Sequence, residues 1–234
     1  MDSKPTIAFD IEVVAPEWEE LDEATRGYLL ERARDEEERR AAKEKLALML
    51  GLGRIVAIGL WRVESGTGGV LVEGERNNGW QTWLGGPEGA KIFMGGEKDL
   101  LTEFWNTVAK CGTLVSYSGR QFDGPVILVR SSIHGVVPSR QLVGNRYRLD
   151  EHCDLLDVLG FQGAVRERFR LDYWCRRYGL ESPKSKLDGS QVGRYYREGR
   201  LIEIAEYCLQ DTRATAALYT KIYPVMIEPF EQRY

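Results

Sequence analysis

The sequence has few residues of the kinds that build zinc sites or disulfide frameworks. Its 234 residues include four cysteines, none in a CxxC spacing, and two histidines, His134 and His152, that are not spaced with the cysteines as ligands. Structural zinc sites depend on such spacings, and disulfide scaffolds need a denser cysteine pattern. We therefore expect reduced, buried thiols and no zinc centre.

Long apolar runs and a secretory leader are also missing. No uncharged apolar stretch approaches the roughly 18 residues needed to cross a bilayer. Residues 1–5 lack a basic segment followed by an apolar one, which a secretory signal would have. Hydrophobic residues make up 43% of the chain and charged residues 29%, as in ordinary globular proteins. We expect a cytoplasmic protein that does not bind membranes.

A general excess of basic charge is absent as well, since the formal net charge is −4. The charge is unevenly distributed, however. Residues 1–50 hold eight Lys and Arg against 14 Asp and Glu, whereas residues 120–200 hold 15 against ten. A basic face in the second half would suit a phosphate backbone, but scattered solvated arginines explain this excess nearly as well.

Hydrophobic patterning predicts an α/β protein with a mixed central β-sheet flanked by helices. Strands are expected at residues 6–14, 54–63, 70–75 and 113–117, with a strand pair or an irregular loop at 80–96. Helices are expected at residues 97–110, 122–132, 169–178, 190–198 and 201–223, and a strand-to-helix passage at 152–159. We expect one domain, residues 1–234, with a charged helical insertion at about residues 15–53. Its apolar stripe would comprise Leu29, Leu30, Ala33, Ala41, Leu46 and Leu50.

Acidic residues occur in three separated segments that would direct their carboxylates to one point. Asp10 and Glu12 interrupt the apolar first strand, where alternation places them on the same face. Asp123 follows a glycine turn, and Asp211 lies on the last long helix. Buried carboxylates are costly without partners, so a converging set indicates cations, and oxygen ligands suit Mg²⁺ or Mn²⁺. A pair of such ions is a recurring device for cutting phosphodiester bonds.

Each segment taken alone has a structural interpretation. An Asp-x-Glu pair in a strand is often a solvated face, and Asp123 before Gly124-Pro125 suits a helix N-cap. Tyr207 and Asp211 have the i, i+4 spacing of a surface pair. The surroundings of Asp10 favour the functional interpretation, because an accidental carboxylate is disfavoured within the most apolar strand.

Taken together, the segments strongly resemble the motifs of the DnaQ-like, DEDD-type 3′–5′ exonucleases of the ribonuclease H-like superfamily. Residues 9–12, Phe-Asp-Ile-Glu, match the first motif, Asp-x-Glu. Residues 117–123, Tyr-Ser-Gly-Arg-Gln-Phe-Asp, match the second, Tyr-Asn-x-x-x-Phe-Asp, except that Ser118 replaces the asparagine. Residues 207–211 match Tyr-x-x-x-Asp of the tyrosine subclass (DEDDy). The chain looks most similar to the proofreading domains of family B DNA polymerases.

The resemblance implies a ribonuclease H-like fold and a 3′–5′ exonuclease that uses two Mg²⁺ or Mn²⁺ ions. The enzyme would act on single-stranded DNA or frayed 3′ ends and release nucleoside 5′-monophosphates. Asp10 would bridge both ions, Glu12 and Asp211 would complete the first site, and Asp123 would hold the second. Tyr207 would orient the attacking water, since its ordinary pKa near 10 argues against a free phenolate.

Candidates for substrate contacts lie around the second motif and in the basic second half. Around the motif they are Tyr117, Ser118, Arg120 and Phe122, the two aromatics by stacking on bases. Candidate phosphate contacts are Arg120, Lys184, Lys186 and Arg194. Asp154 and Asp157 are candidates for supporting the metal ligands, with helix capping as the simpler role for Asp154.

Several alternatives stay open at this point. An exonuclease that trims RNA 3′ ends would have the same metal centre, and a non-catalytic nucleic-acid-binding module would have the same fold. The insertion is a helical decoration, a partner-binding arm or a substrate-guiding arm. Single-stranded DNA or other 3′ ends are the expected ligands, and a polymerase or a DNA repair protein is the expected kind of partner.

Overall fold

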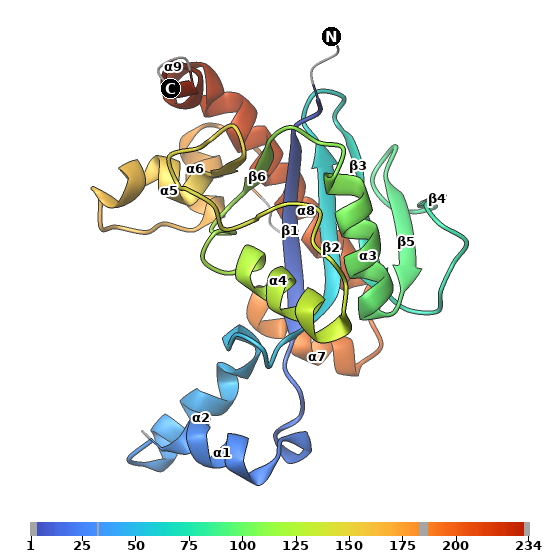
Figure 1. The fold of residues 1–234 in the computed structure, drawn as a ribbon, viewed down its shortest axis with the longest axis vertical. Helices are drawn as coiled ribbons and strands as arrows, with labels where there is room; N and C mark the ends of the chain where they lie inside the picture. The colour runs from blue at the N-terminus through green and yellow to red at the C-terminus, as the bar shows by residue number, and fades with distance from the viewer. Residues whose placement is uncertain (1–3, 32, 183–186, 232–234) are drawn as a thin grey trace.

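A mixed seven-stranded sheet, ordered β4-β5-β3-β2-β1-β6-β7, forms the centre of the part of the chain that the structure describes (Figure 1). The structure is a computed structural model that describes residues 4–31, 33–182 and 187–231. Its strands are β1 (Ile7–Val14), β2 (Arg54–Arg62), β3 (Thr67–Glu73), β4 (Gln81–Thr82), β5 (Lys91–Gly95), β6 (Leu114–Ser116) and β7 (His152–Asp154). The predicted α/β architecture with a mixed sheet is confirmed, and residues 80–96 form a strand pair.

Strand β1 lies inside the sheet, antiparallel to β2 and parallel to β6. Its side chains alternate between two hydrophobic clusters. Ala8 and Val14 pack in one cluster and Phe9 and Ile11 in the other. Because neighbouring residues point to opposite faces, Asp10 lies on the same face as Ala8. The carboxylates of β1 therefore lie on one face, as the sequence predicted.

Helices cover both faces of this sheet (Figure 1). Helix α8 (Leu201–Ile222) contacts β1, β2 and β3, and its buried residues belong to the cluster that includes Ala8. Helices α3 (Glu97–Val108) and α4 (Asp123–His134) pack on the opposite face. Helix α8 therefore faces the carboxylates of β1.

Short helices complete the second half of the chain. They are α5 (Leu155–Leu159), α6 (Leu171–Arg177), α7 (Val192–Arg197) and α9 (Glu228–Glu231). Helices α6 and α7 both contact α8. The four cysteines are buried and free of disulfides, as predicted. In the described ranges, no helix combines the length and the apolar character that a membrane crossing requires.

Residues 15–53, called the insert below, connect β1 to β2 and project away from the sheet (Figure 1). The insert comprises the 3₁₀ segments η1 (Trp18–Glu20) and η2 (Leu46–Leu48) and the helices α1 (Glu23–Leu30) and α2 (Glu36–Glu44). The predicted apolar stripe does not form one face, because the segment breaks into separate helices capped by Asp22 and Asp35. Leu46 is buried at the base of the insert, whereas Leu50 is exposed.

Candidate active site

The two carboxylates of β1 lie against helix α8. Glu12 is buried and Asp10 is partly exposed. One oxygen of each carboxylate and the Cys208 sulfur on α8 lie within 4.8 Å of one another. The Cys208 thiol also donates to the main-chain oxygen of Asp10, with a sulfur–oxygen distance of 3.5 Å. The first and third predicted motifs therefore meet at this point.

Asp123 reaches the same place from the other side of β1. It is the first residue of α4, and its Oδ1 accepts a hydrogen bond from the Ile11 N–H at 3.1 Å. Ile11 lies between Asp10 and Glu12, so this bond positions the Asp123 carboxylate beside the pair. The bond uses a main-chain donor, which any residue except proline would supply at position 11.

The turn before Asp123 is held by a buried aspartate on β7. The two oxygens of Asp154 accept hydrogen bonds from the N–H groups of Ser118 and Arg120, each at 2.9 Å. Asp154 also caps α5 through the Leu156 N–H. Both roles expected for Asp154 are therefore present, since it caps a helix and supports the turn that leads to Asp123.

A glycine on β2 lets helix α8 approach the carboxylates. Gly59 is the register partner of Asp10. A Cβ atom at Gly59 would lie 2.0 Å from Thr212 Oγ1 and 3.0 Å from the Cys208 main-chain oxygen. Sequence reasoning missed this residue, although a glycine inside an apolar strand is a known signal of close backbone approach.

Burial and mutual repulsion dominate the electrostatics of the site. Burial raises the pKa of Asp10 well above its ordinary value, and the charges of Asp123, Glu12 and Asp211 raise it further. The pKa of Glu12 is raised for similar reasons. Burial raises the pKa of Asp123 and of Asp211 to about 7. Four carboxylates that disfavour each other's ionisation form a site that gains strongly from a positive charge.

The donor set fits hard divalent cations. The four side chains offer carboxylate oxygens, which suit Mg²⁺ and Mn²⁺. Asp211 Oδ1 is buried and has no hydrogen-bond partner among the described residues. A cation would satisfy this oxygen and relieve the repulsion that raises the four pKa values.

Tyr207 and Tyr117 lie beside the carboxylates in an open groove of about 1790 Å³, and both line it together with Asp211. Burial is the main reason that the pKa of each hydroxyl is raised, and nearby carboxylates add to it. Both phenols therefore stay protonated at neutral pH. The Tyr117 hydroxyl donates to the main-chain oxygen of Phe169, which fixes the orientation of its ring.

The other candidate substrate residues occupy different environments. Ser118 is partly exposed and adopts a left-handed conformation with φ = 68°. Phe122 packs against the hydrophobic cluster beneath α3 and α4, so its ring serves the core. Arg194 is exposed and lines the groove, whereas Lys184 and Lys186 lie outside the described residues.

Arg120 requires a correction. Its side chain is 7% exposed, and its guanidinium donates to the main-chain oxygens of Gly144 and His152 and pairs with Asp157 at 3.3 Å. An arginine with these internal partners does not offer its charge to a phosphate. The sequence predicted a substrate or phosphate contact for Arg120, whereas neighbouring chain segments enclose its side chain.

Comparisons with known proteins bear on this arrangement. The family described as "Predicted 3'-5' exonuclease related to the exonuclease domain of PolB" matches residues 52–232. No curated protein matches the sequence. The fold is similar to that of the family B DNA polymerase from the hyperthermophilic archaeon Pyrobaculum calidifontis, with a TM-score of 0.61 and 17% identity over 97% of this chain. The match covers 25% of the polymerase chain. These matches confirm the predicted resemblance and the ribonuclease H-like fold.

Proposed function

Because the chain belongs to the family of predicted 3′–5′ exonucleases related to the exonuclease domain of PolB, we propose that it hydrolyses the terminal phosphodiester bond at 3′ ends of DNA. The substrate would be single-stranded DNA or a frayed 3′ end, and the product a nucleoside 5′-monophosphate. The observation that carries this proposal is the convergence of Asp10, Glu12, Asp123 and Asp211. We further propose that residues 1–234 form one exonuclease domain.

We assign the four carboxylates to two Mg²⁺ or Mn²⁺ ions. Asp10 would bind both ions, Glu12 and Asp211 would bind the first, and Asp123 would bind the second. When bound, such ions lower the pKa of an attacking water and neutralise charge on the leaving 3′-oxygen. The unpartnered Oδ1 of Asp211 supports this assignment because it needs a positively charged or donating partner.

Tyr207 would position the attacking water. Its hydroxyl keeps its proton at neutral pH, because burial and the nearby Asp211 charge raise its pKa. A protonated phenol can donate a hydrogen bond or accept one, but it cannot serve as the general base. The water oxygen would form the new bond to phosphorus, the P–O3′ bond would break, and the 3′-oxygen would take up a proton.

The biological setting forms a separate part of the proposal. We propose a cytoplasmic enzyme that acts on 3′ ends during DNA repair or beside a separate polymerase. The family membership supports a nucleic-acid substrate. RNA is the main alternative substrate, and the same assay distinguishes it from DNA.

Digestion of 5′-labelled single-stranded DNA and its RNA counterpart tests the function. Wild type would be compared with Asp10→Ala and Asp211→Ala in Mg²⁺, Mn²⁺ and a chelator. Asp150→Ala serves as the matched control, because Asp150 is exposed and, in the part of the chain that the structure describes, its carboxylate pairs with neighbouring Arg148. We expect a metal-dependent ladder that shortens from the 3′ end, present in the control and absent in both site variants. Folded protein that cleaves neither strand would contradict the proposal and favour the binding module.

A further inference from the structure

The groove beside the carboxylates continues along the insert. Tyr207 and Asp211 line it at the catalytic end, and Trp18, Lys43 and Leu48 of the insert line it at the other. The 3₁₀ segment η2, which contains Leu48 and lies near the C-terminal end of the insert, contacts β1. The base of the insert therefore lies directly beside the strand that carries Asp10. One groove therefore extends from Asp211 and Tyr207 of the site to side chains of the insert.

We propose that the insert binds the nucleotides that precede the 3′-terminal one, with Trp18 stacking on a base and Lys43 contacting a phosphate. This inference rests on the proposed function, because it assigns the path of the same substrate strand. It selects the substrate-guiding role from the roles that the sequence left open. The occupant is single-stranded nucleic acid, since stacking between neighbouring base pairs in a duplex would cover the face on which an aromatic ring stacks.

Trp18 and Lys43 form a pair that suits a nucleotide. The ammonium of Lys43 lies 4.8 Å from the centroid of the Trp18 ring. Trp18 is partly exposed and Lys43 is exposed, so a ligand in the groove can reach both side chains. An aromatic face next to a cation offers a stacking surface and a phosphate contact at adjacent points, as in proteins that bind single strands.

Helix α7 forms a wall of the groove and carries arginines that a phosphate can recruit. Arg194 and Arg197 on α7 line the groove and are 54% and 62% exposed. Arg194 lies 3.8 Å from Glu198, and Arg197 lies 3.4 Å from Glu17 of the insert. Exposed ion pairs of this kind contribute little free energy, so a phosphate oxygen can replace the carboxylate.

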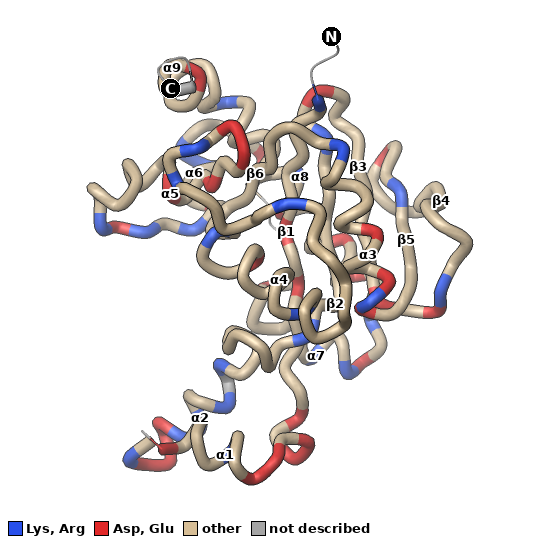
Figure 2. The backbone as a smooth tube through the Cα atoms, viewed as in Figure 1, with Lys and Arg blue, Asp and Glu red and all other residues tan. Residues whose placement is uncertain are grey.

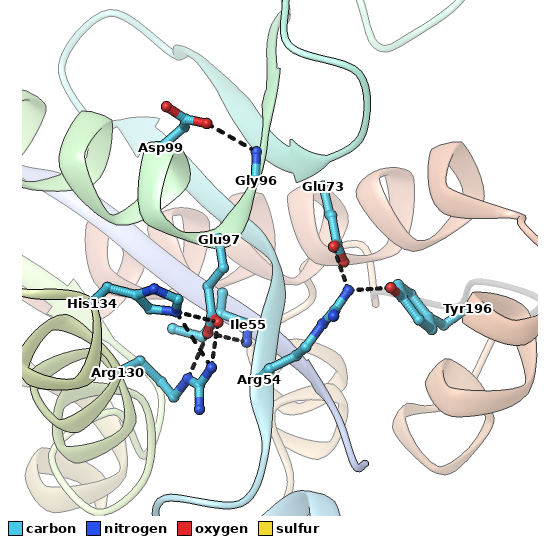
Figure 3. Close-up of polar contacts among 9 residues, drawn as sticks. All are labelled: Arg54, Ile55, Glu73, Gly96, Glu97, Asp99, Arg130, His134 and Tyr196. Carbon is cyan, nitrogen blue, oxygen red and sulfur yellow. Dashed lines mark hydrogen bonds and ion pairs between the residues drawn. The ribbon is translucent and has the colours of Figure 1, made fainter. Parts of the chain in front are cut away.

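A polar network fixes this wall where the insert joins the sheet (Figure 3). Arg54, the first residue of β2, donates to Glu73 on β3 and to the Tyr196 hydroxyl on α7. Arg54 and Tyr196 both line the groove. The guanidinium is therefore engaged within the protein, and we assign Arg54 a positioning role that links α7 to the base of the insert.

A second network anchors the same region from the other face of the sheet (Figure 3). The buried Glu97 carboxylate accepts hydrogen bonds from the Ile55 N–H at 2.8 Å and from Arg130 Nε at 2.7 Å. The ring of His134 lies 2.8 Å from the same carboxylate. These contacts tie α3 and α4 to the residue that follows Arg54, so the insert emerges from a rigid base.

Charges of both signs lie along the insert and the groove. Acidic positions concentrate in the first part of the insert and at its outer end (Figure 2). Among the described residues of the insert, Lys43 lines the groove together with Glu17 and Glu20. Cations that can attract a phosphate backbone along the groove include Lys43 and, on α7, Arg194 and Arg197.

The length dependence of digestion tests the proposal. Wild type is expected to process a long single strand with a higher kcat/KM than a dinucleotide, because only the long strand reaches the insert. Trp18→Ala is expected to reduce this preference about tenfold through KM. Lys43→Gln is expected to lower the slope of log KM against log salt concentration by about 0.7, the loss of one phosphate contact.

Tyr28→Ala and Lys45→Gln are the matched controls. Both residues are exposed on the insert and neither lines the groove, so their variants should keep the wild-type preference and salt slope. An active enzyme whose Trp18→Ala and Lys43→Gln variants match these controls would overturn the inference while leaving the proposed function intact. If folded wild-type protein cleaves neither the long strand nor the dinucleotide, the proposed function is contradicted instead. Circular dichroism would verify that each variant is folded.

Discussion

Ser118 has a backbone conformation that residues other than glycine and asparagine rarely adopt. Its φ of 68° lies in the left-handed region, at the position where the resembled motif has asparagine. A left-handed residue costs about 1–2 kcal/mol, and asparagine tolerates it better than most. The motif's preference for asparagine therefore has a backbone explanation that does not require a substrate contact.

Replacing Ser118 by asparagine should stabilise the protein. We expect Ser118→Asn to raise the free energy of unfolding by about 0.5 kcal/mol and the melting temperature by about 1–2 °C. Thermal unfolding measures this change. Ser132→Asn is the control, because Ser132 is exposed on helix α4 and should gain nothing. Equal shifts in the two variants would show that the backbone at Ser118 is unstrained.

Removing the Tyr207 hydroxyl should slow catalysis without changing its pH dependence. We expect Tyr207→Phe to lower kcat about tenfold to a hundredfold, because the water loses one orienting partner. The shape of the kcat–pH profile should stay the same, since the raised pKa of this hydroxyl keeps it protonated throughout. A profile that loses an ionisation in the variant would identify Tyr207 as a base. Tyr28→Phe is the control, because Tyr28 is exposed and is not among the residues that line the groove.

At the scale of elements, the site depends on how closely α8 lies against β1 and β2. The first motif is on a strand, the third is on this helix, and no covalent link sets their separation. Gly59 and Thr212 set it instead, because Thr212 Oγ1 occupies the space where a Cβ atom at residue 59 would lie. The Thr212 hydroxyl also donates to the Cys208 main-chain oxygen at 2.7 Å, which fixes its direction.

Adding a methyl group at Gly59 should therefore displace the helix. We expect Gly59→Ala to lower the free energy of unfolding by about 1–3 kcal/mol and kcat by about a hundredfold, since a shift near 1 Å misaligns the metal ligands. Denaturant titration and the digestion assay measure both effects. Gly27→Ala is the matched control, because no other group lies within 4 Å of the added Cβ. Normal activity in folded Gly59→Ala would contradict the importance of this contact.

At the scale of the whole molecule, the cluster of buried carboxylates links stability to pH. A carboxyl whose folded pKa exceeds its unfolded pKa binds protons more tightly in the folded state. Its contribution to stability falls as the pH rises from the unfolded value, near 4, to the folded value, about 7 for Asp123 and Asp211. The metal-free protein should therefore carry a destabilising contribution at pH 8 that is absent in acid.

His152 acts in the opposite direction. Burial lowers the pKa of the His152 ring to about 4. The contribution of this residue to stability is therefore lost as the pH falls below the ordinary pKa of histidine. Its Nδ1 lies 2.6 Å from the Leu142 main-chain oxygen, which requires a proton on Nδ1 and leaves Nε2 to accept from Ser116. The two effects overlap between about pH 4 and pH 6.5, so wild-type stability alone does not separate them.

The difference between wild type and Asp123→Asn separates the two effects. Without metal, we expect the variant to be about as stable as wild type near pH 4 and more stable at pH 8, by on the order of 2–4 kcal/mol. Mn²⁺ should stabilise wild type more at pH 8 than at pH 5 and stabilise the variant less. Denaturant unfolding with a chelator or with Mn²⁺ measures these differences in the free energy of unfolding. A difference independent of pH would mean that the carboxylates ionise freely, contrary to their burial.

The sequence by itself determined the resemblance to a 3′–5′ exonuclease and the main elements of the sheet and helices. Carboxylates within an apolar strand are disfavoured unless a function requires them, so Asp10 and Glu12 stood out without structural information. Period-two alternation placed both on one face, and helical spacing placed Tyr207 one turn from Asp211. These inferences succeed because they depend only on local geometry, which neighbouring residues dictate.

Only the tertiary structure decided which surfaces these elements present to one another. Arg120 was predicted to contact substrate, but segments distant in sequence enclose its guanidinium. A glycine within the apolar strand β2 indicates a close backbone approach, but only the structure shows that α8 is the element that approaches Gly59. The insert has a composition typical of a solvated helix, yet Trp18 and Lys43 line the groove that also contains Tyr207 and Asp211. Such roles depend on the packing of remote segments, and packing is a property of the assembled fold, not of any local stretch of sequence.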